Sequence, residues 1–155
     1  ELSLTAAESD RSSDRIDLIL FNSKSLELRC FEVKTFKNSE LKKKAGRVPV
    51  VDQIARYRKQ IEKRREELLA GYAQYVEIVN MLCDLRIPKP RSISERVDLV
   101  VFEFTTEERK KLTEKFVPTF ENKFNCHAIG QASRASQNGL NKWWTAKHID
   151  TKPNK

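Results

Sequence analysis

Three charged side chains lie in two short apolar segments near the start of the chain. Asp17 belongs to segment 16–21, and Glu32 and Lys34 lie toward the end of segment 26–36. Both segments have the composition of β-strands. Side chains two residues apart on a strand share a face, so we expect Glu32 and Lys34 to lie roughly 6 to 7 Å apart along it. Neighbouring strands lie about 5 Å apart, which would let Asp17 and Glu32 converge.

Two carboxylates and an ammonium group suit the hydrolysis of phosphodiester bonds. Proteins hold Mg²⁺ with hard oxygen ligands and bound water, so we expect Asp17, Glu32 and the backbone carbonyl of Val33 to hold Mg²⁺ or Mn²⁺. Such an ion polarises the phosphate and lowers the pKa of a bound water. Lys34 would stabilise the negative charge that develops on the phosphate or orient the attacking water. Inside an apolar strand, Asp17 would be costly without a partner or a metal.

Gln53 and Tyr57 form a second pair of candidate site residues. They are four residues apart in a predicted helix, so they share one face of it. Tyr57 lies beside the apolar stripe of that helix, and both side chains could lean over the edge of the sheet. An amide and a phenol next to a metal site would help to hold a nucleic-acid strand.

The net positive charge is confined to one part of the chain. Positions 34–65 contain twelve basic and three acidic residues, a net charge of +9, whereas the other residues carry −1 and the whole chain +8. Such a block is typical of a surface that binds a phosphate backbone, although a solvated loop and helix face would have the same composition. The residues expected to contact DNA are Lys37, Lys42, Lys43, Lys44, Arg47, Arg56, Lys59 and Lys63.

The apolar segments predict an α/β fold. Segments 16–21 and 26–36 are expected to pair as a hairpin, with the second strand central in the sheet. Further strands are predicted at 97–104 and 124–129. Strands that alternate with helices indicate a central mixed β-sheet flanked by helices.

Two helices are predicted between these strands, with a boundary at Gly71. The first starts near Val50 and carries a core stripe, and the second ends near Arg86. A capping box of Thr105 and Glu108 predicts a third helix. The stripe of the first helix consists of Ile54, Ile61 and Leu68, and the apolar face of the second of Tyr72, Tyr75, Val76, Val79, Leu82 and Cys83.

The chain length of 155 residues fits one compact domain. We place this domain at 15–130. The N-terminal segment 1–14 is predicted to be a loop or the end of a truncated helix, and 131–155 is predicted to be a polar C-terminal tail. The sequence begins with Glu1 rather than methionine, so we expect it to be part of a longer parent chain. No segment is apolar enough to predict a membrane span.

The order Asp17, Glu32-x-Lys34 and Gln53-x-x-x-Tyr57 resembles the PD-(D/E)xK nuclease superfamily. The resemblance is to its branch with a Gln-x-x-x-Tyr motif, which includes RecB-like and lambda-exonuclease-like domains. It covers about positions 15–60 by motif and 15–130 by the order of elements. One departure is Ile16, which stands where the family name has proline.

The resemblance implies a restriction-endonuclease-like core and metal-dependent cleavage of DNA. It assigns metal binding to Asp17 and Glu32, catalytic support to Lys34, and accessory roles to Gln53 and Tyr57. The family adds a further acid from a preceding helix. In this sequence Glu8 is the candidate for that acid, and Glu1 and Asp10 are the other acidic residues that could take its place.

Other residues that could do chemistry have simpler interpretations. Asp98 and Glu103 are expected to be strand-edge residues, Cys126 and His127 core and surface residues, and His148 part of the polar tail. The cysteines Cys30, Cys83 and Cys126 have no paired spacing, so we expect no disulfide framework and a reducing, cytoplasmic setting. Trp143 and Trp144 could stack on bases or pack against the domain.

These observations favour a metal-dependent deoxyribonuclease, either an endonuclease or an exonuclease. It would be the effector domain of a larger restriction, anti-phage defence or DNA-processing protein. Its expected partners are DNA and the other domains of that protein, and the chain could also form a homo-oligomer. Two other functions are weighed. One is a catalytically inactive nucleic-acid-binding module of the same fold, and the other is a protein-interaction domain with an acidic partner.

Overall fold

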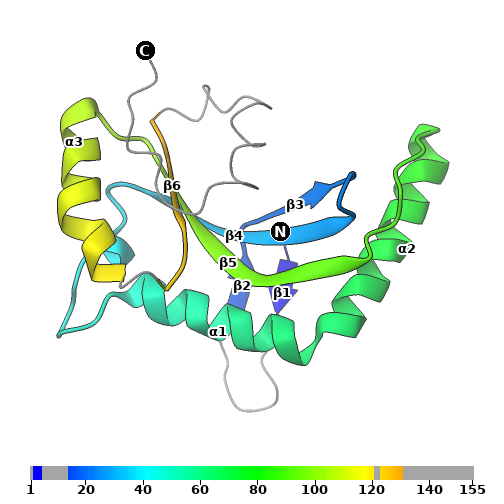
Figure 1. The fold of residues 1–155 in the computed structure, drawn as a ribbon, viewed down its shortest axis with the longest axis horizontal. Helices are drawn as coiled ribbons and strands as arrows, with labels where there is room; N and C mark the ends of the chain where they lie inside the picture. The colour runs from blue at the N-terminus through cyan, green and yellow to red at the C-terminus, as the bar shows by residue number, and fades with distance from the viewer. Residues whose placement is uncertain (1, 5–13, 121–122, 131–155) are drawn as a thin grey trace. The chain divides into compact units, whose positions relative to one another are not determined.

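The structure is a computed structural model that describes residues 2–4, 14–120 and 123–130 (Figure 1). Its main sheet has four strands in the order β3, β4, β5, β6. These strands are β3 (Leu18–Asn22), β4 (Glu27–Thr35), β5 (Ser92–Phe102) and β6 (Cys126–Ile129). β3 and β4 are antiparallel, whereas β5 and β6 are parallel. The predicted α/β class with a mixed sheet and flanking helices is confirmed.

Helical segments occupy the connections between the strands. The two long helices are α1 (Pro49–Lys63) and α2 (Arg65–Cys83). The short segments are η1 (Ser39–Leu41), α3 (Thr106–Lys111), η2 (Leu112–Phe116) and η3 (Val117–Phe120). No helix in the described ranges has both the length and the apolar character needed to cross a membrane.

The chain forms two compact units, each treated separately below. Unit 1 comprises Glu1–Phe31 and Ala55–Val97, and unit 2 comprises Glu32–Ile54 and Asp98–Lys155. Strands β4 and β5 and helix α1 contribute residues to both units.

In unit 1, the predicted hairpin is confirmed. Its ladder extends from Leu18 opposite Phe31 to Asn22 opposite Glu27. The Asn22 side-chain oxygen accepts hydrogen bonds from the backbone N–H groups of Lys24 and Ser25. An asparagine that accepts from nearby backbone groups in this way stabilises a tight turn.

The N-terminal segment is not the end of a helix where the structure describes it. Strand β1 (Leu2–Leu4) pairs antiparallel with β2 (Asp14–Ile16) as a separate two-stranded sheet. The prediction of a loop or helix end is therefore wrong for these residues. The candidate acids Glu1, Glu8 and Asp10 lie outside the described residues, as do Trp143, Trp144, His148 and the predicted tail.

The boundary between the two long helices lies at Arg64 and not at Gly71. Arg64 has backbone angles φ −114° and ψ 21°, which interrupt the helix, whereas Gly71 continues α2. A glycine lowers helix stability without ending a helix that is held by packing. The predicted stripe of α1 and α2 is confirmed, because Ile54, Ile61 and Leu68 are all buried.

The predicted apolar face of α2 is buried in only part. Val76 is buried, but Tyr75 is 60% exposed and Leu82 74% exposed, and Cys83 is exposed as well. Hydrophobic spacing along a helix identifies one face, but it cannot tell whether other elements reach far enough to cover that face.

In unit 2, β6 lies beside the end of β5, with Leu99 opposite Cys126. The predicted capping box is confirmed, because Thr105 and Glu108 each accept a hydrogen bond from the other's backbone N–H. The helical run after it packs aromatic rings into this unit, with Phe36 stacked on Phe116 at 5.5 Å between ring centroids.

The three cysteines predict a simple pattern of thiol reactivity. All are free thiols; Cys30 and Cys126 are buried and Cys83 is exposed. Burial raises the pKa of Cys30 and of Cys126 to about 12, so neither forms the reactive thiolate near neutral pH. We expect DTNB to titrate one thiol in the native protein and all three after denaturation in guanidinium. Rapid reaction of two or three thiols in the native protein would contradict the burial of these side chains.

Candidate functional site

Glu32 and Lys34 form a buried ion pair in unit 2. Their side chains project from the same face of β4, as their spacing predicts, and Lys34 Nζ lies 2.5 Å from Glu32 Oε1. The Glu32 side chain is 1% exposed and that of Lys34 is 11% exposed. Phe31 and Cys30, which precede Glu32, are also buried, and β4 lies between two other strands. The predicted central position of this strand is confirmed.

A second carboxylate, from Glu40, contacts the same ammonium. Lys34 Nζ lies 2.5 Å from Glu40 Oε2. Glu40 belongs to η1, whose position is held by the buried Leu41 and by Asn38, whose side chain accepts a hydrogen bond from Glu40 N–H at 2.8 Å. Sequence reasoning missed Glu40. The sequence did contain a sign of it: Glu40 directly follows Asn38 and Ser39, two residue types that cap helices, inside a lysine-rich loop.

The surroundings of Lys34 keep it positively charged. Burial by itself would lower its pKa, but the hydrogen bonds and charges of Glu32 and Glu40 outweigh this effect, and the pKa is raised. A lysine with a raised pKa remains protonated through the whole neutral range. The Glu32–Lys34–Glu40 cluster therefore combines a permanent cation with two carboxylates.

In unit 1, Asp17 lies at a bend between β2 and β3, and it is exposed. The prediction that Asp17 lies within one apolar strand at 16–21 is wrong. The chain turns at this residue, because Ile16 pairs with Leu2 in the small sheet whereas Leu18 pairs with Phe31 in the main sheet. An exposed carboxylate stays hydrated and pays no free energy for leaving water. The expectation that a buried Asp17 would need a metal or a partner therefore does not apply.

Tyr57 is buried in unit 1, and its hydroxyl group forms a hydrogen bond with the backbone. The ring is 1% exposed, and the hydroxyl donates a hydrogen bond of 2.6 Å to the backbone carbonyl of Arg15. Arg15 lies on β2, two residues before Asp17. Tyr57 thus holds the backbone that leads to Asp17.

Substitution of Tyr57 by phenylalanine tests this hydrogen bond. Phenylalanine keeps the buried ring and removes only the donor, so we expect the free energy of unfolding to fall by about 1 kcal/mol. Urea unfolding measures the change. Tyr75→Phe, at an exposed tyrosine of the same unit, is the control and should change stability by less than about 0.5 kcal/mol. Equal effects would show that the Arg15 contact contributes nothing.

Gln53 and Val33 belong to unit 2. Gln53 is half-buried in α1, one helical turn before Tyr57, and Val33 is half-buried between Glu32 and Lys34. Helix α1 starts at Pro49, whose fixed φ and missing N–H suit the first position of a helix. This start sets the position of Gln53 along the helix.

The residues predicted to contact DNA are all exposed. In unit 2, Lys44 and Arg47 flank a tight turn and exchange two backbone hydrogen bonds, while Ala45 and Gly46 occupy the left-handed region. Lys42 and Lys43 directly precede this turn. In unit 1, Arg56, Lys59 and Lys63 lie on α1 at spacings of three and four residues, which places them on one side of the helix.

Asp98 and His127 form a buried pair in unit 2. Asp98 is 4% exposed and His127 6% exposed, and His127 Nε2 lies 3.2 Å from Asp98 Oδ2. Asn125 donates hydrogen bonds to both carboxylate oxygens, from its backbone N–H and its side-chain amide. The prediction of Asp98 as an edge residue is wrong, because β5 lies between β4 and β6. The prediction of His127 as a surface residue is wrong as well, because its side chain is buried against Asp98. Cys126 is buried, in agreement with its predicted place in the core.

The Glu32–Lys34–Glu40 cluster offers the donor chemistry of a divalent-cation site. Its two carboxylates already share one cation, the Lys34 ammonium. Within the described ranges, no three His, Cys, Asp or Glu side chains gather into a metal-binding group. A metal ion here would need backbone carbonyl and water ligands besides carboxylates, as is common for Mg²⁺.

Comparison of this chain with protein-family models, curated proteins and solved structures finds no match.

Proposed function

We propose that this protein is a metal-dependent nuclease that hydrolyses phosphodiester bonds of DNA. The observation that carries the proposal is the Glu32–Lys34–Glu40 cluster. A buried ion pair adds little to stability, because the cost of removing two charges from water offsets their attraction. Buried charged clusters at the end of a strand are instead common at functional sites.

The metal ligands in this proposal are Asp17, Glu32 and the carbonyl of Val33. In the sequence, Asp17 directly precedes Leu18, and Glu32 directly follows Phe31. A bound Mg²⁺ or Mn²⁺ ion would supply polarisation of the phosphate and a water of lowered pKa. Lys34 stabilises negative charge on the phosphate, and Glu40 positions Lys34 for this role.

The basic residues of the loop and of α1 support DNA as the substrate. Lys37, Lys42, Lys43, Lys44 and Arg47 leave their charge available at the surface of unit 2, and Arg56, Lys59 and Lys63 do so in unit 1. Cations of this kind bind the phosphate backbone regardless of sequence. The resemblance to PD-(D/E)xK nucleases supports the same substrate, and with it a place in a larger restriction, defence or DNA-processing protein.

One observation favours a second candidate function, a non-catalytic nucleic-acid-binding module. Both carboxylates near Lys34 already form ion pairs with its ammonium, an arrangement that can persist without a metal ion. This alternative predicts salt-sensitive binding of DNA without cleavage.

A cleavage assay separates the two functions. Supercoiled and linear DNA are incubated with the protein in Mg²⁺, in Mn²⁺ and in EDTA. We expect cleavage with either metal and none in EDTA, and we expect the double variant Glu32→Ala with Lys34→Ala to be inactive. Equal behaviour of wild type and double variant under every condition would reject the nuclease. Salt-sensitive binding by an inactive wild type would then identify the binding module.

A further inference from the structure

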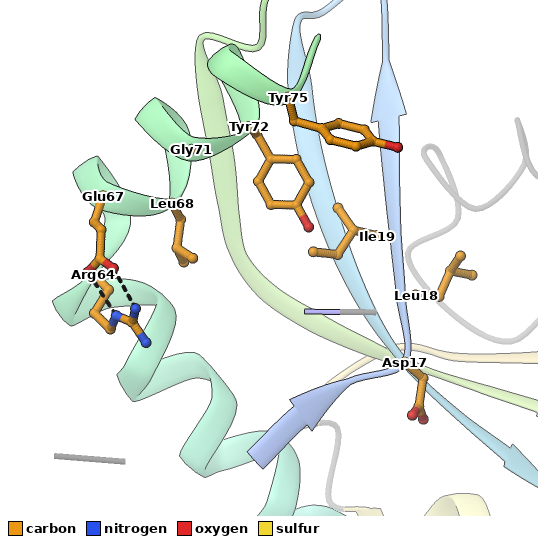
Figure 2. Close-up of a pocket in the computed structure, with 9 residues that line it drawn as sticks. All are labelled: Asp17, Leu18, Ile19, Arg64, Glu67, Leu68, Gly71, Tyr72 and Tyr75. Atoms are coloured by element: carbon orange, nitrogen blue, oxygen red, sulfur yellow. Dashed lines mark hydrogen bonds and ion pairs between the residues drawn. The ribbon is translucent and has the colours of Figure 1, made fainter. Parts of the chain in front are cut away.

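A pocket in unit 1 extends from the start of β3 to α2 (Figure 2). Its volume is about 580 Å³, within the range of pockets that hold small organic ligands. Apolar walls come from Leu18, Ile19 and Leu68, and the lining also includes Asp17. The pocket therefore adjoins one of the proposed metal ligands.

Two tyrosines give the pocket an aromatic wall. Figure 2 shows Tyr72 and Tyr75 projecting from α2 towards β3, and their rings pack edge to face at 6.4 Å between centroids. Tyr72 is half-buried and Tyr75 is 60% exposed. Burial, with smaller contributions from Cys30 and Tyr75, raises the pKa of Tyr72 to about 12, so its hydroxyl remains a hydrogen-bond donor. Faces of phenol rings are favourable surfaces for the stacking of nucleobases.

Gly71, in the middle of α2, widens this pocket. A Cβ atom added at Gly71 would meet no atom within 4 Å, and its φ lies outside the range that favours glycine. Neither packing nor backbone conformation thus requires glycine here, although glycine lowers helix stability relative to alanine. The structural effect of the missing side chain is open space in the pocket.

An arginine also lines the pocket. Arg64 is held by two hydrogen bonds to Glu67, of 2.9 and 2.5 Å. Its Nη1 atom is buried and donates to no group in the part of the chain that the structure describes. Asp17 also lines the pocket, but Figure 2 shows its carboxylate directed away from the two tyrosines. The pocket thus combines a hydrogen-bond donor with flat apolar and aromatic walls, as the edge and faces of a nucleobase require.

We propose that this pocket receives an unpaired nucleobase, so that the substrate class of the site is single-stranded DNA or a duplex with an unpaired nucleotide. The proposal rests on the nuclease function for the role of Asp17, but the binding of the base requires no cleavage. A base within a duplex cannot reach such a pocket unless it leaves the stack, at an energetic cost. Single-stranded DNA meets no such cost.

The test measures binding in EDTA, where no metal-dependent cleavage occurs. Fluorescence anisotropy compares a labelled single strand, the same strand as a duplex, and the same strand with abasic sites. Gly71→Leu fills the pocket with a good helix former, and Ala70→Leu makes a like change at the neighbouring exposed position. We expect Gly71→Leu to weaken single-strand binding about tenfold, since stacking of one base contributes that much, and to leave duplex binding unchanged. Ala70→Leu should match the wild type.

Two further measurements keep the result interpretable. Tyr75→Ala removes an exposed ring with little risk to folding, and it should also weaken single-strand binding. Abasic sites should weaken binding to the wild type but not to Gly71→Leu. The proposal is overturned if Gly71→Leu and Tyr75→Ala bind the single strand like the wild type, or lose single strand and duplex equally. Absence of cleavage with Mg²⁺ would reject the nuclease alone, because the binding results do not depend on it.

Discussion

Glu32→Gln is expected to leave the protein folded and to lower the rate of metal-dependent DNA cleavage by about 10³-fold. Glutamine has the same shape, and its carbonyl oxygen can still accept a hydrogen bond from Lys34. It lacks the negative charge that a divalent cation needs. A loss of about 4 kcal/mol of transition-state stabilisation corresponds to this change in rate. The measurement is the initial rate of cleavage of linear DNA in Mg²⁺, with circular dichroism as the check of the fold.

Glu40→Gln is the matched control for Glu32→Gln. Both carboxylates lie 2.5 Å from Lys34 Nζ, but the Glu40 side chain is 41% exposed and that of Glu32 is 1% exposed. In the proposed mechanism Glu40 acts only by positioning Lys34, so we expect a decrease of about tenfold, as for residues that orient a ligand without contacting the metal. Equal losses in the two variants would show that Glu32 has no special role.

Asp98→Ala is expected to cause the largest loss of stability among single substitutions in unit 2. It leaves His127 and two N–H donors of Asn125 without their acceptor in a buried place. Breaking a buried charged network in this way costs about 3 to 5 kcal/mol. Urea unfolding at neutral pH measures the change. Asp98→Asn keeps the shape and one acceptor oxygen, so it should be less destabilising than Asp98→Ala.

The same pair predicts how stability depends on pH. Burial alone would raise the pKa of Asp98, but the hydrogen bond and charge of His127, together with the hydrogen bonds of Asn125, lower it below its ordinary value of 3.8. The contribution of Asp98 is therefore complete above about pH 3.8 and is lost as the pH falls through the lower folded-state pKa. Asp98→Asn removes this dependence. An unchanged acid profile in Asp98→Asn would contradict the pairing.

Local signals in the sequence identified the elements whose formation depends on neighbouring residues. The hairpin of segments 16–21 and 26–36, the Thr105–Glu108 capping box and the Ile54, Ile61, Leu68 stripe were predicted because each rests on short-range hydrogen bonding or helical periodicity. The shared face of Glu32 and Lys34 followed from the alternation of a strand. These features need no knowledge of the rest of the fold.

The errors concern properties that depend on distant parts of the chain. The bend at Asp17 arises because β1, at the start of the sequence, pairs with β2. The burial of Asp98 depends on β4 and β6 lying on either side of β5. Glu40 joins the candidate site because Leu41 anchors its loop in the core of unit 2. The two strand arrangements leave no pattern in the local sequence, and Glu40 leaves only the Asn-Ser cap that precedes it.

Anomalous diffraction from crystals soaked in Mn²⁺ is the sharpest test of the proposed metal-dependent nuclease site at Glu32. We expect an anomalous peak within coordination distance of a Glu32 carboxylate oxygen and the Val33 carbonyl oxygen, about 2 Å as expected for a hard cation of this size. We also expect the peak to be absent in Glu32→Gln. Saturating Mn²⁺ with no peak at Glu32, while Lys34 still bridges Glu32 and Glu40, would contradict the proposed site.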